Sequence, residues 1–146
     1  MNKMKIAPRT RTFLLTLGGF AVLAVLLLLG GGPDPGGSGR LDDTEARAEY
    51  LSSCGWEIDP ASEQAETVHI PERFSPVYAE YNELQRQQGF DLADYAGKDC
   101  DLYTYTVTNY PDESQMVLVN LYLYRGRVIA GDVHSTNLDG FMIGLQ

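Results

Sequence analysis

The sequence predicts an α+β fold, with an N-terminal transmembrane helix followed by a small domain in which a helix packs on an antiparallel sheet. A long run without charged residues near the start of the chain predicts the transmembrane helix. After Gly97 the apolar residues recur every second position instead of every three or four, which predicts helices first and strands later. The length of 146 residues suits one domain with an appendage.

The appendage begins with a basic segment, residues 1–12, and continues with the uncharged segment 13–32. Twenty such residues are enough for a helix to cross a hydrocarbon core of about 30 Å. All four basic residues precede the run, so the positive-inside rule predicts a cytoplasmic N-terminus and a signal anchor in the cell membrane, with the rest of the chain outside. The alternative is a signal peptide cleaved before Pro33, with Gly30 and Gly32 as the small residues at −3 and −1, which would give a secreted protein.

Residues 33–40 are rich in Gly and Pro and predict a flexible tether before the extracytoplasmic domain, residues 41–146. From Asp34 onward, 20 acidic residues face seven Lys and Arg, a net charge of −13. A domain this acidic repels phosphate, which excludes nucleic acid as a partner. Two cysteines in the whole chain also exclude a disulfide-dense scaffold and a four-cysteine zinc site.

The first helix of the domain is expected to begin in residues 41–45, where Asp42 can cap it and Glu45 can complete a capping box. Gly55 is expected to end it. Two extended segments follow: 56–58 is expected as a short strand or an extended link, and 66–70 as a short strand.

A second helix is predicted over residues 75–88, because Ser75 can cap it and Pro76 suits its first position. Its apolar residues recur at intervals of three and four, which gives it one apolar side. One more helical turn is expected at residues 91–95.

Three strands are predicted at residues 102–110, 116–124 and 127–134, joined as an antiparallel meander. The middle strand places Val and Leu on one face and Asn and Tyr on the other. A three-stranded sheet needs a cover on its apolar face, and the helix at 75–88 is the predicted cover.

The turn at residues 125–126 raises a question of register. A plain two-residue loop would pair Asp132 with Val119 and place an acid on the apolar face. A three-residue loop, or a bulge near Gly131, would instead pair Val119 with Val133. The sequence therefore predicts one of these two irregularities.

Several short motifs resemble one family, and they span roughly residues 45–145. They are YNELQ at 81–85, QGFDL at 88–92, Tyr95, GK at 97–98, YTY at 103–105, NYP at 109–111, GD at 131–132 and DGF at 139–141. The family resembled is one of uncharacterised, membrane-anchored domains of clostridial Gram-positive bacteria, a domain of unknown function. The resemblance implies an extracytoplasmic position and a role other than catalysis, and it assigns no catalytic residue.

Asn120, Tyr122 and Tyr124 are the candidate binding residues, because they share the sheet face opposite the Val and Leu row. If that face is open, they form a platform of the kind that binds peptides or glycans. The alternative is that another element covers them, either the first helix or the C-terminal segment 141–143.

Asp132 and His134 are the one pair that suggests a hydrolase, and a catalytic role requires the fold to bring them within hydrogen-bond reach. Neither a nucleophile motif nor a set of metal ligands accompanies them, so no enzyme, cofactor or metal is predicted. Cys54 and Cys100 allow two interpretations, a disulfide formed outside the membrane or two buried thiols.

These observations together predict a membrane-anchored extracytoplasmic binding or interaction module of the bacterial cell envelope. Its expected partners are the membrane, through residues 13–32, and an envelope protein or peptide. Two alternatives remain, namely an inhibitor or sensor of an envelope protein that presents the hairpin at 125–126, and an envelope hydrolase that uses Asp132 and His134.

Overall fold

The computed structural model of this chain describes residues 39–146. The predicted cytoplasmic segment 1–12, the predicted transmembrane segment 13–32 and all but the end of the tether lie outside the described residues. No helix within residues 39–146 combines the length and the apolar character needed to cross a membrane.

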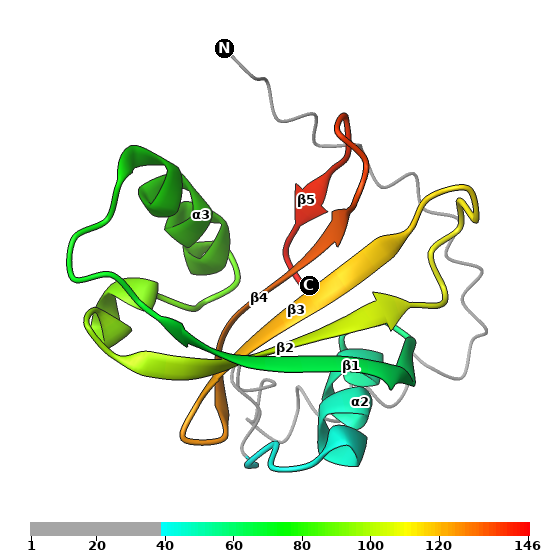
Figure 1. The fold of residues 1–146 in the computed structure, drawn as a ribbon, viewed down its shortest axis with the longest axis horizontal. Coiled ribbons are helices and arrows are strands. Elements are labelled where there is room, and N and C mark those ends of the chain that lie inside the picture. Colours follow the sequence, from blue (N-terminus) through cyan, green and yellow to red (C-terminus); the bar gives the residue numbers. More distant parts are fainter. Residues whose placement is uncertain (1–38) are drawn as a thin grey trace, which may run out of the picture.

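The described part of the chain contains two α-helices, one 3-10 turn and a five-stranded antiparallel sheet, whose strands follow one another in the order of the sequence (Figure 1). The predicted α+β class and the predicted meander are therefore confirmed. The elements are α2 (Thr44–Ser53), β1 (Ile58–His69), α3 (Pro76–Arg86), η1 (Leu92–Tyr95), β2 (Asp99–Val107), β3 (Val117–Tyr124), β4 (Arg127–Ser135) and β5 (Met142–Ile143).

The start of the sheet differs from the prediction, because one longer strand, β1, takes in the end of the first predicted segment and most of the second. Its pairing with β2 is interrupted between Asp59 and Gln64. Within this irregularity the hydroxyl of Ser62 accepts a hydrogen bond from the backbone N–H of Thr106, at 2.8 Å. A side chain thus satisfies a donor of β2 at the point where the ladder is broken.

The caps of the helices follow the sequence closely. Ser75 caps α3 as predicted, with its hydroxyl accepting from Tyr78 N. The cap of α2 is Asp43, which accepts from Ala46 N at 2.8 Å, and not Asp42. Asp42 instead accepts a hydrogen bond from Arg40 Nε at 2.9 Å.

The connection from β3 to β4 confirms the predicted bulge. Residues 125–126 form a two-residue turn with positive φ at both positions, and the register shifts between Tyr122 and Leu123. Because of this shift, Val119 pairs with Val133 and Asp132 pairs with Asn120. Asp132 therefore lies on the face opposite the Val and Leu row.

The two α-helices pack on opposite faces of the sheet (Figure 1). Leu51 of α2 belongs to the cluster built by the alternate residues of β3 from Val117 to Leu123. On the other face, the ring of Tyr81 in α3 lies 6.2 Å from the ring of Tyr122. The prediction that the helix at 75–88 covers the Val and Leu row is therefore wrong, since α2 covers that row and α3 covers the tyrosine face.

The C-terminal segment adds a strand that the sequence did not predict. Residues 142–143 form β5, which pairs with Val133 and His134 of β4. Beyond it, Leu145 is fully buried, and its carbonyl accepts a hydrogen bond from the indole N–H of Trp56 at 2.8 Å. The segment at 141–143 thus extends the sheet instead of covering the tyrosine face.

Candidate functional site

The residues predicted as an open binding platform are half-buried beneath α3 and η1. The ring of Tyr122 contacts Tyr81 of α3, and the ring of Tyr124 lies 5.4 Å from that of Tyr95 in η1. Asn120, the third predicted residue, is half-buried as well. The structure therefore shows a second core layer at this position and not an open platform.

Asp132 is the centre of a buried polar network on this face. Its side chain is fully buried, and its Oδ2 accepts a hydrogen bond from the hydroxyl of Tyr81 at 2.6 Å and a longer one from Asn120 Nδ2 at 3.4 Å. Its Oδ1 lies 2.7 Å from Nδ1 of His134. An ionised Asp132 can only accept hydrogen bonds, so in that state Nδ1 of His134 is the donor of the pair. Thr104 completes the network by donating to Asn120.

Burial is the main cause of the tyrosine pKa values here. It raises the pKa of Tyr81 far above its ordinary value, and the neighbouring Asp132 adds to the effect. Burial and the same carboxylate raise the pKa of Tyr122 to about 12. Both hydroxyls therefore keep their protons at neutral pH, and the Tyr81 hydroxyl donates its proton to Asp132 in a hydrogen bond.

The pair Asp132–His134 meets the distance condition for the hydrolase interpretation, but a second pair meets it too. Nδ1 of His69 lies 2.7 Å from Asp99 Oδ1. The two pairs differ in exposure, because the side chains of His69 and Asp99 are 60% and 69% exposed, whereas those of His134 and Asp132 are 21% and 1% exposed. Only the second pair combines a buried carboxylate with a ring that solvent can reach.

Two glutamines, Gln85 in α3 and Gln88 just after it, join the helix to β4 and to the C-terminal segment. Gln85 Oε1 accepts from Gly131 N at 2.9 Å, and Gln88 Nε2 donates to Gly131 O at 3.0 Å. Gln88 Oε1 in turn accepts from Leu145 N at 2.6 Å. The two side chains supply bonds that a neighbouring strand would otherwise make. Apolar periodicity does not reveal such residues, and no local signal in the sequence predicts this role.

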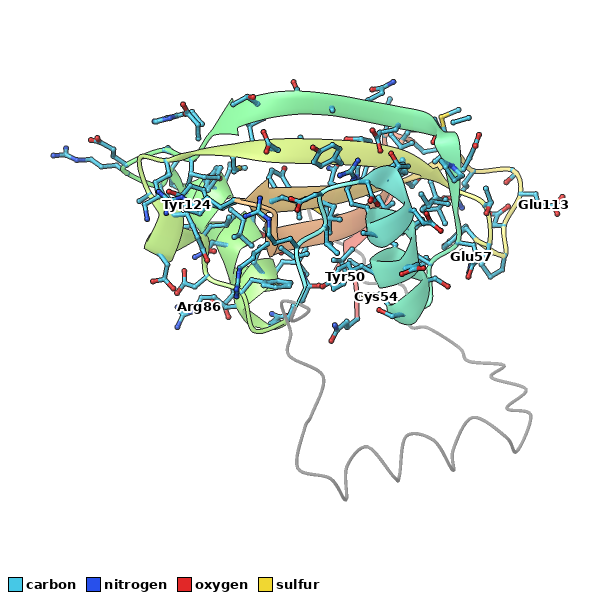
Figure 2. All side chains as sticks on the ribbon, turned by 90° about the horizontal axis from the view of Figure 1, so that it is seen from below. Tyr50, Cys54, Glu57, Arg86, Glu113 and Tyr124 are labelled. Carbon is cyan, nitrogen blue, oxygen red and sulfur yellow. The ribbon has the colours of Figure 1, made fainter. Side chains whose placement is uncertain are left out.

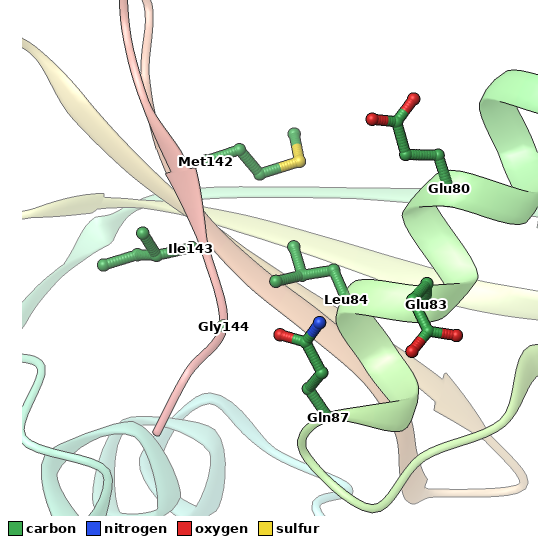
Figure 3. Close-up of a pocket in the computed structure, with 7 residues that line it drawn as sticks. All are labelled: Glu80, Glu83, Leu84, Gln87, Met142, Ile143 and Gly144. Atoms are coloured by element: carbon green, nitrogen blue, oxygen red, sulfur yellow. The ribbon is translucent and has the colours of Figure 1, made fainter. Parts of the chain in front are cut away.

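A groove of about 270 Å³ lies between α3 and β5 (Figure 3). Sites for drug-sized ligands usually measure about 300–1,000 Å³, so this groove suits a few side chains of a partner better than a large cofactor. Figure 3 shows Leu84 projecting from α3 toward β5. The lining residues are Glu80, Glu83, Leu84 and Gln87 from the helix, and Met142, Ile143 and Gly144 from the strand and its continuation.

The outer edge of β5 faces this groove. β5 is the last strand of the sheet, and within the described residues it pairs with β4 alone. Ser135 N donates to Phe141 O at 3.0 Å, which directs the backbone groups of residues 141 and 143 toward β4. By alternation, the backbone groups of Met142 and Gly144 point away from β4, and both residues line the groove.

A second polar cluster lies on the α2 side of the sheet, and its side chains form hydrogen bonds with one another. Arg47 is buried, donates to Tyr105 and to Glu63, and lies 3.8 Å above the ring of Tyr103. Glu63 also accepts from the hydroxyls of Tyr105 and Thr44. Burial raises the pKa of Glu63, but these hydrogen bonds and the Arg47 charge outweigh it, and the pKa is lowered. The cluster ties α2 to β1 and β2.

With this geometry established, the comparisons with known proteins identify a family. The family model for a domain of unknown function, DUF4830, matches residues 50–133. The chain belongs to this family. A search of curated proteins and a search of solved structures each found no match.

The DUF4830 match confirms that the chain resembles a domain of unknown function. The matched residues run from the end of α2 to near the end of β4, so they include α3 and Asp132. His134 and β5 lie just beyond them.

The cysteines of this DUF4830 domain are two free thiols, so the disulfide interpretation is corrected. Cys54 packs beside the α2 cluster, whereas Cys100 is buried in the cluster beneath α3 on the other face. The sheet separates the two sulfurs, and a bridge cannot span it without movement of the backbone. Burial raises the pKa of the Cys100 thiol to about 11. Among residues 39–146, no three His, Cys, Asp or Glu side chains are grouped to hold a metal ion.

Proposed function

We propose that this DUF4830 chain is a membrane-anchored, extracytoplasmic binding module of the cell envelope, whose partner occupies the groove between α3 and β5. The groove carries the proposal, because it joins half-buried apolar side chains to a strand edge that has no further strand beside it within residues 39–146. The uncharged segment 13–32 and the basic segment 1–12 before it support the anchor and its orientation.

The groove is a better partner surface than the hairpin at 125–126. One side of the hairpin contacts the start of the domain, where Leu41 N donates to Gly126 O at 2.8 Å. A Cβ at Gly126 would lie 2.7 Å from Asp42 Oδ1, which shows how closely the two segments approach. An inhibitor or sensor of an envelope protein is one form that such a module could take, and it would then act through the groove.

The proposed location is tested by fusing alkaline phosphatase, which is active only outside the cytoplasm, after Gln146 of the full chain. Active phosphatase is the expected result. A cytoplasmic reporter that works at the same position, together with an inactive phosphatase, would contradict the proposed orientation.

The proposed binding role is tested by placing a photo-crosslinking amino acid at Leu84 in the full chain, in intact cells of its source. Glu113 provides the control position, because Figure 2 shows it at the opposite end of the domain from Arg86 at the end of α3. A discrete protein adduct from position 84 that is missing from position 113 is expected. Equal adducts at the two positions, or none at 84, would contradict a partner in the groove.

The pair Asp132–His134 supports a second candidate, an envelope hydrolase in which His134 acts as general base. The observation that favours it is the 2.7 Å contact between a buried carboxylate and a partly exposed imidazole. Hydrolysis of p-nitrophenyl acetate by the full chain tests it. A hydrolase should lose its rate with His134→Gln and keep it with His69→Gln, and equal rates in all three proteins would exclude this use of the pair.

A further inference from the structure

We infer that the partner segment binds as an extended strand added to the outer edge of β5, and that it carries basic side chains that meet Glu80 and Glu83. This inference rests on the proposed binding function and specifies its partner.

The strand edge supplies the backbone part of the recognition. The N–H and C=O groups of Met142 and Gly144 point away from β4 and into the groove. An extended peptide laid along such an edge pairs its own backbone with these groups, which is a recurrent mode of peptide recognition. β5 contains two residues, so the edge offers a short ladder, and the groove must contribute further contacts.

The helix side of the groove supplies side chains that can contact the side chains of the partner strand. Leu84 and Met142 are half-buried and offer apolar contact to every second side chain of an added strand. Glu80 and Glu83 are exposed on the same side of α3, and neither forms an ion pair within residues 39–146. A basic side chain of the partner would therefore meet two carboxylates that the described part of the domain does not neutralise.

The overall charge favours the same partner. Residues 39–146 contain 19 acidic residues against seven Lys and Arg. Such a field steers basic segments toward the domain and repels acidic ones. It also disfavours a second copy of this chain as the occupant, because pairing two β5 edges would bring the carboxylates of both grooves together.

Fluorescence anisotropy with the full chain in mild detergent tests the inference, and the probe is a labelled eight-residue peptide that alternates lysine and valine. A glutamate–valine peptide of the same length reverses the charge. Two further probes carry N-methyl groups on the lysine amides or on the valine amides, so that each loses the donors of one strand edge. We expect the lysine–valine peptide to bind, the glutamate–valine peptide not to bind, and one of the two methylated peptides to fail while the other binds.

Two variants with equal charge changes locate the site. Glu80→Gln/Glu83→Gln removes the acids of the groove, and Glu45→Gln/Glu49→Gln removes two exposed acids from α2 on the other face. Exposed ion pairs contribute little each, so the first variant should weaken binding by about three- to tenfold at low salt and the second should leave it unchanged.

Equal weakening by both variants, equal binding of the two charge types, or full binding of both methylated peptides would overturn the inference. These outcomes are separable from failure of the proposed function. A groove adduct from position 84 in cells, combined with no preference for basic extended peptides, would keep the binding role and reject this partner class.

Discussion

Replacing Tyr81 with Phe removes one hydroxyl from the contact between α3 and the sheet and leaves its ring packed on Tyr122. Asp132 then loses its shortest hydrogen bond, of 2.6 Å, while it stays fully buried. A hydrogen bond to a charged group contributes roughly 1.5–3 kcal/mol, and a fully buried acceptor favours the upper part of that range. We therefore expect Tyr81→Phe to lower the free energy of unfolding by about 2–3 kcal/mol.

Urea unfolding followed by tryptophan fluorescence measures this loss, because the chain has one tryptophan, Trp56, and it is buried. With a urea m value of about 1.5 kcal/mol/M, the midpoint should fall by roughly 1.3–2 M. The matched control is Tyr78→Phe on the same helix, whose hydroxyl makes no hydrogen bond within residues 39–146 and whose loss should cost less than about 0.5 kcal/mol. Similar small losses in both variants, or an undiminished cost of Tyr81→Phe in an Asp132→Asn background, would refute the assigned role of the hydroxyl.

Three further predictions follow from other parts of the domain. The folded pKa of Glu63 lies below its ordinary value of 4.5, so its stabilising effect is present above that pH and is lost as the pH falls through the lower folded value. Glu63→Gln should therefore flatten the acid dependence of urea unfolding below pH 4.5, and an unchanged slope would count against the cluster. Cys54 and Cys100 should titrate as two free thiols in denaturant without reductant, and fewer than two would restore the disulfide. Gly131→Ala would place a Cβ 2.5 Å from a methyl of Leu145, so it should lower stability by about 1–3 kcal/mol in thermal unfolding, and full stability would contradict that packing.

Local signals in the sequence were sufficient for most of the elements. Ser75 followed by Pro76 marks the start of α3, and the alternation of β3 marks its two faces. The register between β3 and β4 was also predictable, because a plain turn would have placed Asp132 among apolar residues.

The faces that the helices cover could not be predicted from apolar patterns. α2 buries Arg47, whose charge is compensated by Glu63 from β1. The buried side of α2 is therefore not uniformly apolar in sequence. α3 buries Asn82 and Gln85 and contacts the sheet through hydroxyls and amides as well as rings. A pattern that scores apolar residues alone therefore assigns α3 to the wrong face.

One part of the candidate site was predictable from the sequence and the other was not. Asp132 and His134 are two residues apart on one strand, so their shared face followed from alternation. The groove depended on β5, which has two residues and follows a loop, and no pattern of that length separates a strand from a turn. Only the fold places this short edge opposite Leu84.

Amide hydrogen exchange of Met142 and Gly144 in the full chain, with and without the lysine–valine peptide, tests most directly whether a partner occupies the groove as an added strand. Strand addition predicts that these two amides exchange more slowly when the peptide is bound, while the amide of Gly126 in the distant hairpin is unaffected. Unchanged exchange at Met142 and Gly144 under saturating peptide, or protection centred on the hairpin, would contradict binding at the edge of β5.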